Sequence, residues 1–510
     1  MSRSDIAIKG STIGITSQIV NLVLKFIVRT YAIRFLGKEL LGLDSVLLDV
    51  VGMLSLAELG ITSVMLFRMY APVIEKNQQR ISELLSSYKV IYRIISGIVL
   101  VLGIIISFFL PNIITNVSIS WDIIYITFFL QVINAVASYL LAYQRILLNA
   151  DQKKHLCIVV DLIVTVVFSV AKIVVLIIWS DYIIYTAITI FQTVSANVYL
   201  MYYVKRKYPF VDTHIKARKE DMKVVLLDTK DVVAGKLAVY VYMSTDNLIV
   251  SIFMGTGIVG ILSNYKYISS AIKGLVNNAM ITMQPLIGNY LNSGASKENS
   301  FLTLKRYIFV RYLIAGISCA ALIASANSFI LFWTNSSEFV LPEIVVVLLA
   351  LDYYIGCVYG PLGEYLNALG MFRIAKYPQF AGAVINILGS LIGVKIGGII
   401  GVLFATVISQ VAIFTGYAYY VFFRYYSEDF TIAKNFAITH FKYTVVSIIS
   451  LFACIYFSTF SFEIGHLGDF IAKAMLSMML FIVISIVTLW QSDECQFIIQ
   501  LIKSKVVKAL

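Results

Sequence analysis

Long apolar segments dominate this chain, and short polar stretches separate them. A membrane span needs about 20 mainly apolar residues, and by that measure the sequence predicts 14 transmembrane helices. The predicted spans cover residues 8–34, 41–66, 90–110, 121–143, 156–179, 182–204, 231–254, 260–290, 307–333, 341–367, 378–394, 397–423, 441–460 and 468–490. The pattern therefore predicts an all-α polytopic membrane protein.

Composition supports the same class. Apolar residues make up 60% of the chain, charged residues 13%, and the mean hydropathy is +0.88, which excludes an ordinary soluble domain. With the N-terminus inside, the cytoplasmic segments hold 29 Lys and Arg residues, whereas the external loops hold only Lys38 and Lys395. This asymmetry predicts that both termini are cytoplasmic. The net charge of +12 then reflects membrane orientation, so we expect no nucleic-acid partner.

The longest hydrophilic stretch divides the predicted helices into two groups. We interpret residues 205–230 as a solvated, basic cytoplasmic linker between an N-terminal lobe of six helices, residues 1–204, and a C-terminal lobe, residues 231–423. Residues 424–510 then form a C-terminal helix pair with a cytoplasmic tail. The polar tail Met1–Gly10 leads directly into the first span, so we expect no cleavable signal peptide.

A short sequence echo links the two halves. The segment Phe35–Leu43 reads FLGKELLGL, and Phe253–Ile261 reads FMGTGIVGI, 218 residues later. Each copy follows the first helix of its half, and six spans separate the copies. Both halves therefore run in the same direction, which predicts two pseudo-symmetric lobes related by an axis along the membrane normal.

Nine cations inside the predicted spans indicate a pathway for an anionic molecule. A charge at bilayer depth costs roughly 2.5–3.5 kcal/mol, so such residues usually face a bundle interior or a wet cavity. Polar residues around Arg29 and Lys273 recur at helical spacing, which predicts a central cavity between the lobes. The nine residues are Lys25, Arg29, Arg34, Lys172, Lys236, Lys266, Lys273, Arg311 and Lys473.

Five of these cations are our candidate substrate-binding residues: Lys25, Arg29, Lys236, Lys266 and Lys273. Three acidic residues in or beside the same spans, Glu58, Asp246 and Asp352, are candidates for ion coupling or charge balance.

Structural explanations for the charged residues remain open. Long side chains near span ends can snorkel to the interface, which is the structural interpretation of Arg34, Arg311 and Lys473. Asp161 and Lys172 lie on one face of a span and are expected to pair with neighbouring helices. Structural ion pairs with Asp44, Glu58, Asp246 or Asp352 are the alternative for four further cations, Lys25, Arg29, Lys266 and Lys273.

Soluble-enzyme chemistry has no support in the sequence. The four histidines and five cysteines show no metal-ligand or nucleophile–base spacing, and no Walker motif for ATP hydrolysis is present. We therefore expect no catalytic residues, metal or cofactor, and interpret the protein as a carrier or scramblase-like machine rather than an enzyme.

A group of motifs lies in the first hundred residues: Phe35-Leu-Gly37, Leu41-Gly42-Leu43, Met53–Ile61, Met69-Tyr70-Ala-Pro72, Tyr88-Lys89 and Tyr92-Arg93. This group resembles Wzx-type polysaccharide flippases of the multidrug and oligosaccharidyl-lipid/polysaccharide exporter superfamily. The resemblance implies a MATE-like, alternating-access bundle in a bacterial cytoplasmic membrane. It implies transport of an undecaprenyl-pyrophosphate-linked oligosaccharide from the cytoplasmic to the outer leaflet, with membrane lipids, glycosyltransferases and a polysaccharide polymerase as partners.

Two other transporters of that superfamily remain as alternatives. The 14 spans are also similar to lipid II flippases, whose extra helix pair contributes a groove for the lipid tail. A multidrug cation antiporter would share the fold but should present acidic groups to its substrate. The spans and their edges hold nine cations against seven acids, which disfavours the antiporter.

Overall fold

The computed structural model describes residues 3–55, 61–213, 215–280, 297–368, 371–425, 430–460, 462 and 465–500. Its contacts divide the chain into two compact units, Met1–Gly260 and Ile261–Leu510. Within the described ranges, ten helices are long and apolar enough to cross a membrane, and the protein is therefore a multi-pass membrane protein. The count of 14 spans and the six-helix lobes remain predictions.

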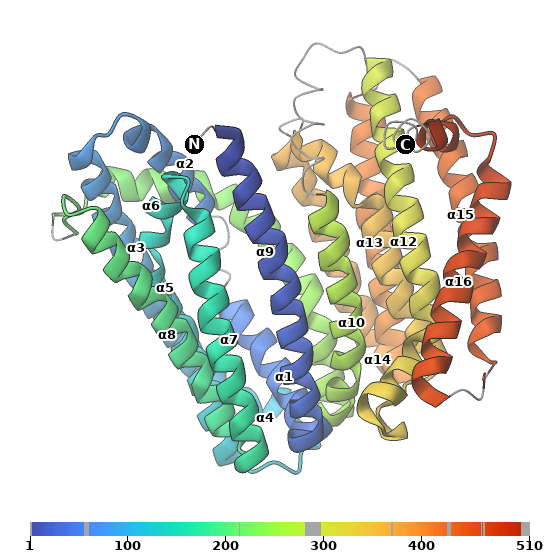
Figure 1. Cartoon of the computed structure of the whole chain (residues 1–510), viewed down its shortest axis with the longest axis horizontal. Coiled ribbons are helices and arrows are strands. Elements are labelled where there is room, and N and C mark those ends of the chain that lie inside the picture. Colours follow the sequence, from blue (N-terminus) through green and yellow to red (C-terminus); the bar gives the residue numbers. More distant parts are fainter. Residues whose placement is uncertain are drawn as a thin grey trace. The chain divides into compact units, whose positions relative to one another are not determined.

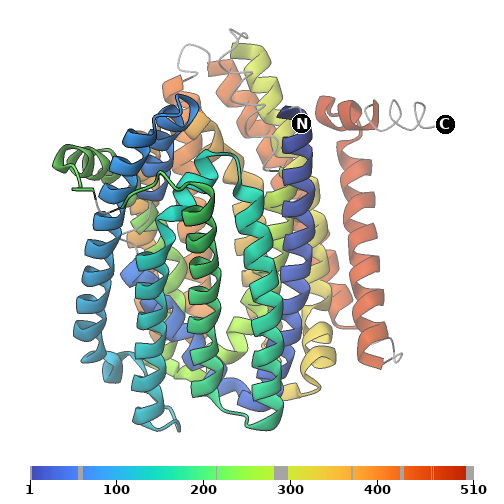
Figure 2. The same cartoon turned by 60° about the vertical axis from the view of Figure 1, so that its left-hand side comes forward.

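The described residues of the first unit form nine helices and the start of a tenth (Figure 1). In chain order they are α1 (Arg3–Leu54), α2 (Ile61–Ile74), α3 (Gln78–Ser107), α4 (Leu110–Ile113), α5 (Trp121–Ala142), α6 (Gln144–Ala150), α7 (Lys154–Ile178), α8 (Tyr182–Lys207), α9 (Lys219–Met254) and α10 (Thr256–Met280). Helices α3, α5, α7 and α8 run side by side (Figures 1 and 2). Helix α9 packs against α1, α2 and α3, so this unit ends one helix later than the expected N-terminal lobe.

The two echoed segments adopt the same backbone turn. Gly37 interrupts α1 with φ 73° and ψ 178°, and Gly255 separates α9 from α10 with φ 87° and ψ 165°. Both glycines lie in the positive-φ region that disfavours residues with a side chain. The sequence echo therefore marks a repeated helix–glycine–helix junction.

The linker between α8 and α9 is shorter than expected and lies along α3. Residues 205–207 belong to α8, residues 219–230 belong to α9, and residues 208–213 and 215–218, here called the linker strap, contact the polar start of α3. A row of serines on α3 provides most of the contacts, because a hydroxyl can satisfy the backbone groups of an extended segment. The bonds join Ser82 Oγ to Phe210 O (3.2 Å), Ser86 Oγ to Ile215 O, and Arg218 N to Ser87 Oγ (3.1 Å).

The described residues of the second unit form the rest of α10 and seven further elements, followed by a short helical segment at residues 493–500. The seven are α12 (Lys297–Thr334), η2 (Ser337–Phe339), α13 (Glu343–Ala368), α14 (Phe372–Tyr419), its π-helical extension η3 (Tyr420–Tyr425), α15 (Phe430–Ser458) and α16 (Gly465–Leu489). Its core is aromatic, with the Tyr312 ring stacked 4.8 Å from Tyr443 and 5.7 Å from Phe481.

Helix α14 is two helices joined at a sharp bend. Gly397 and Gly398 have non-helical torsions, and Gly398 has φ 56°. An ideal Cβ on Gly393 would lie 2.4 Å from the carbonyl oxygen of Gly401, so the two halves meet backbone to backbone beside the bend. The bend lies where the sequence predicted a boundary between the spans 378–394 and 397–423.

Candidate substrate-binding site

A carboxylate on α1 organises a charged cluster among the membrane-spanning helices of the first unit. Asp44 Oδ1 accepts hydrogen bonds from Gln131 Nε2 on α5 (3.2 Å) and from the Tyr182 hydroxyl on α8 (3.1 Å). These donors lie on α5 and α8, so Asp44 faces other helices of the same unit. Neutral donors from two other helices thus stabilise one half-buried carboxylate.

Two cations accompany Asp44. Arg29, one of the predicted substrate-binding residues, and Lys172 on α7 both interact electrostatically with the Asp44 carboxylate. Lys172 Nζ also lies 5.1 Å from the ring centroid of Tyr185, a cation–π contact with α8. The expected pairing of Lys172 with a neighbouring helix is confirmed. The cluster carries two positive charges against one negative charge, so it favours an anionic group.

A second hydrogen-bonded carboxylate follows along α1. Asn247 Nδ2 on α9 donates to Asp49 Oδ2 at 2.7 Å, and the neighbouring Asp246 is buried. Asp246 was proposed from the sequence as a coupling or balancing acid. Its burial on α9 beside this bond is compatible with that role, which stays a prediction.

The second unit gathers its own charges around Cys357 on α13. Lys273, Arg311 and Asp352 all lie within electrostatic range of the Cys357 side chain. Lys273 Nζ lies 3.4 Å from the position of an ideal Cβ on Gly356, so Gly356 leaves the space that the ammonium group approaches. Two predicted site residues, Lys273 and Asp352, are therefore brought together within this unit.

Gln410 on α14 completes this cluster. Its side-chain amide donates to the Asp352 carboxylate, and its Oε1 lies 3.3 Å from the same ideal Cβ position on Gly356. Gln410 and the first unit's Gln131 thus occupy similar chemical roles, each donating an amide hydrogen bond to a carboxylate beside membrane cations. Sequence analysis missed both, since a single glutamine in an apolar span has no distinctive spacing.

Arg311 is locked by a buried ion pair, and the snorkelling interpretation of this residue is wrong. Its side chain is 3% exposed, and Nη2 lies 2.7 Å from Glu364 Oε1. The Tyr307 hydroxyl donates to Glu364 Oε2 at 2.8 Å, and Arg311 Nη1 donates to Asn277 Oδ1 at 3.1 Å. Because α12 packs against α13, the guanidinium meets a carboxylate inside the unit and does not need the interface.

Lys473 is also buried rather than extended toward the interface. Its ammonium group pairs with Asp469 at 2.9 Å, one turn earlier on α16, and donates to Ser328 Oγ on α12 at 3.3 Å. Arg34, the third residue of that group, is exposed on α1. Arg311 and Lys473 are therefore structural cations, as the sequence suggested. They are stabilised by burial and ion pairing, and not by snorkelling to the interface.

For the remaining predicted site residues, the structure gives at most the helix on which each lies and its exposure. Lys25 is exposed on α1, and Lys266 is partly buried on α10. Lys236 lies on α9, but its side chain is outside the described part of the structure, as is the whole of Glu58. The expected convergence of all five cations on one chamber stays a prediction.

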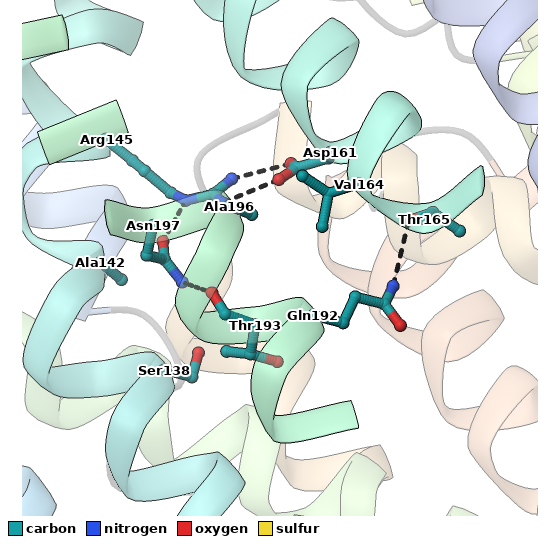
Figure 3. Close-up of a pocket in the computed structure, with 10 residues that line it drawn as sticks. All are labelled: Ser138, Ala142, Arg145, Asp161, Val164, Thr165, Gln192, Thr193, Ala196 and Asn197. Carbon is teal, nitrogen blue, oxygen red and sulfur yellow. Dashed lines mark hydrogen bonds and ion pairs between the residues drawn. The ribbon is translucent and has the colours of Figure 1, made fainter. Parts of the chain in front are cut away.

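A polar cavity of about 380 Å³ lies among α5, α6, α7 and α8 (Figure 3). Arg145, at the start of α6, forms a bidentate ion pair with Asp161 on α7 at 2.7 and 2.8 Å. Arg145 Nε also donates to Asn197 Oδ1 on α8 at 2.8 Å. The expected pairing of Asp161 is confirmed, but Arg145 was missed because it follows the predicted span 121–143 and was counted as a loop cation.

The second unit has a contrasting, apolar pocket of about 410 Å³ formed by α13, α14 and α15. Ala418, Ile448 and Leu451 are among its lining residues, and His440 closes one side with its ring 3.9 Å from Phe436. Such a surface suits a hydrocarbon chain.

The fold defines a multi-pass membrane protein with charged clusters among its helices. The chain belongs to the polysaccharide biosynthesis protein family, whose model matches residues 7–291. A comparison of the sequence with curated proteins found no significant match.

Among solved structures, the fold is similar to "Lipid II flippase MurJ, inward closed conformation", with a TM-score of 0.70 and 16% identity over 94% of this chain and 99% of that chain. It is also similar to an inward-facing multidrug resistance MATE family transporter of the MOP superfamily, with a TM-score of 0.57 and 14% identity over 80% and 97% of the two chains. A Vibrio cholerae MATE transporter, VcmN, matches with a TM-score of 0.54 and 12% identity over 81% and 96%. At these identities the likeness establishes the fold.

Proposed function

We propose that this protein is a flippase of the Wzx type. It moves an undecaprenyl-pyrophosphate-linked oligosaccharide repeat unit from the cytoplasmic to the outer leaflet of a bacterial cell membrane, for surface polysaccharide synthesis. The process needs no covalent chemistry and no cofactor. Membership in the polysaccharide biosynthesis protein family and the MurJ-like and MATE-like fold support a transporter that serves this kind of product.

The observation that carries the proposal is the cationic cluster around Asp44. Arg29 and Lys172 provide two positive charges to one carboxylate at membrane depth, with the hydroxyl and amide donors of Tyr182 and Gln131 beside them. A diphosphate is an anionic acceptor of hydrogen bonds, and Arg and Lys are the side chains that bind it best. A cationic drug would meet the opposite charge balance, which disfavours the antiporter alternative.

Two further features fit a lipid-linked anion. Lys273 supplies a positive charge beside Gln410 in the second unit, and the apolar pocket of α13, α14 and α15 in the same unit suits part of a prenyl chain. A lipid II-type flippase stays the second candidate, since it would use the same chemistry and the MurJ fold is similar over nearly the whole chain.

The membrane potential can drive the proposed step. Moving about two negative charges outward across an inside-negative potential of about 100 mV releases roughly 4–5 kcal/mol, provided that protein charges do not move equally. An alternating-access cycle can therefore run without ATP. Glu58, Asp246 and Asp352 remain the proposed sites if an ion is coupled as well.

Replacement of the proposed headgroup cations in cells tests this function. Arg29→Ala and Lys273→Ala should each lower surface polymer by about tenfold or more and cause lipid-linked intermediates to accumulate, because each removes a charge-assisted contact worth about 1.5–3 kcal/mol. Arg93→Ala and Lys395→Ala, at exposed positions, are the matched controls and should export normally at equal membrane expression. Normal export by both site variants would refute the assigned role.

A further inference from the structure

The cavity around Arg145 has the size and lining of a small-molecule site. Its volume of about 380 Å³ falls within the range of roughly 300–1,000 Å³ that is typical of such sites. Four helical elements contribute to it, and polar side chains from α5, α7 and α8 surround the same space (Figure 3). These helices all belong to the first unit.

The charges of this cavity cancel one another. Arg145 and Asp161 form a bidentate pair, so the site attracts neither a diphosphate nor a cation strongly. Hydrogen-bonding capacity nevertheless remains. The bonds to Asp161 and Asn197 use three of the five N–H groups of the guanidinium, and the Asp161 side chain is 43% exposed, with further lone pairs.

Uncharged polar groups add further hydrogen-bond donors and acceptors to the wall of the cavity. Gln192 Nε2 donates to Thr165 Oγ1 at 3.1 Å, which leaves the Gln192 carbonyl as an acceptor. Ser138 on α5 and Thr193 on α8 add hydroxyl groups to the lining (Figure 3). The wall therefore presents donors and acceptors without net charge, an arrangement that matches molecules whose groups both donate and accept.

We propose that this cavity binds sugar rings of the lipid-linked saccharide that the protein transports. A sugar hydroxyl donates and accepts at once, so neighbouring hydroxyls can bridge the Asp161 carboxylate and the Arg145 guanidinium. A prenyl chain would cover the polar wall of the cavity and offer no partner to its remaining donors and acceptors, which is costly. The inference rests on the proposed function and adds a saccharide subsite, formed by the first unit, that is separate from the charged cluster around Asp44.

Binding to the full-length protein in nanodiscs tests this subsite. The probes are undecaprenyl diphosphate and three lipids in which it carries glucose, galactose or N-acetylglucosamine. The test variants are Gln192→Leu/Thr193→Val and, separately, Ser138→Ala, none of which removes the Arg145–Asp161 pair. Gln79→Leu at an exposed position and Thr439→Val at a half-buried position, both outside the cavity, are the matched controls.

For the wild type, we expect at least one sugar-bearing lipid to bind about tenfold more tightly than the bare lipid, as a few uncharged hydrogen bonds would give. The Gln192→Leu/Thr193→Val variant should reduce this advantage to about twofold or less, and Ser138→Ala should reduce it partly. The affinity for the bare lipid and the thermal midpoint should stay at wild-type values in both variants.

Three results would overturn the subsite. The wild type could bind the bare and the sugar-bearing lipids equally, or the variants could keep the full sugar advantage. Alternatively, free sugars titrated alone could bind as tightly as the lipids, which would assign the cavity to a soluble sugar. In each case binding of the bare lipid would still support diphosphate recognition, whereas failure of every lipid to bind would contradict the proposed function itself.

Discussion

Gly42 on α1 and Gly260 on α10 pack against each other through their backbones in a reciprocal way. An ideal Cβ on Gly42 would lie 1.8 Å from Thr256 O and 2.8 Å from Gly260 N. An ideal Cβ on Gly260 would lie 1.8 Å from Lys38 O and 3.0 Å from Gly42 N. Lys38 and Thr256 occupy equivalent places in the two echoed segments, so the contact has local two-fold symmetry, and the repeated glycines have a packing role.

Gly42→Ala should therefore destabilise the protein. The added methyl group would overlap a backbone carbonyl, which cannot move without shifting its helix. Overpacking of this kind lowers the free energy of unfolding by about 1–3 kcal/mol or more. We expect a lower thermal midpoint in detergent, measured by loss of the monodisperse size-exclusion peak on heating. Gly97→Ala is the control, because nothing lies within 4 Å of its ideal Cβ. An unchanged midpoint for Gly42→Ala would contradict the observed contact.

Because Arg311 and Glu364 form an ion pair, we expect the effects of substituting the two residues on stability to be non-additive. Glu364→Leu leaves the buried guanidinium without its carboxylate, so it should lower the free energy of unfolding by about 3 kcal/mol. Arg311→Met/Glu364→Leu removes both charges and should recover most of that loss, since buried ion pairs often add little over apolar replacements. Thermal midpoints of the two single variants and the double variant test this. A double variant that loses as much as the two single variants together would argue against direct pairing.

The linker strap should open when the ion pairs that hold the strap and the adjoining start of α9 to α3 are weakened. Arg80 forms two bonds to Asp221 at 2.6 and 2.8 Å, and Arg218 pairs with Glu83 at 3.0 Å. Asp221→Asn should raise trypsin cleavage after Lys216 and Arg218 about fivefold, which corresponds to roughly 1 kcal/mol of local stability. Asp122→Asn, at an exposed helix start, is the control and should leave cleavage unchanged.

Tyr208 lies outside the membrane spans, and its environment predicts that the stability of the folded protein falls at alkaline pH. Burial, followed by its hydrogen bond to Asp151, raises the pKa of Tyr208 from 10.0 to about 12. The folded state thus favours the neutral phenol, so its contribution to stability is complete below about pH 10 and is lost as pH rises toward 12.

The thermal midpoints of wild type and Tyr208→Phe measure this contribution. Their difference should be constant from pH 8 to about pH 10 and should shrink at higher pH. Tyr199→Phe, whose side chain is 52% exposed, should show no such trend. A difference for Tyr208→Phe that grows with pH would contradict the proposed environment of the phenol.

Local sequence patterns predicted much of the fold, because span length and helix-breaking glycines act within a few residues. The bend at Gly397 and the paired junctions at Gly37 and Gly255 are examples. Interactions between helices were harder to predict. The partner of Arg311 depends on the packing of α12 against α13, and the pairing of Arg145 with Asp161 depends on the packing of α6 against α7.

The candidate site was predictable in part for the same reason. Charges in apolar spans are rare, so Arg29, Lys273 and Asp352 stood out, and each lies in a charged cluster. Their hydrogen-bonding neighbours, Gln131 and Gln410, became visible only once the helices were in place.

Flipping by the purified protein in proteoliposomes tests the central claim most directly. An undecaprenyl-diphosphate-linked oligosaccharide with a fluorescent sugar is placed in both leaflets, and a membrane-impermeant reductant quenches the outer label. Wild type and Lys395→Ala should expose the inner pool to quenching, faster under a potential that pulls anions toward the outside of the liposome. Arg29→Ala/Lys273→Ala should slow this phase at least about tenfold. Equal rates for wild type and the double variant, or no flipping by the wild type, would contradict the account.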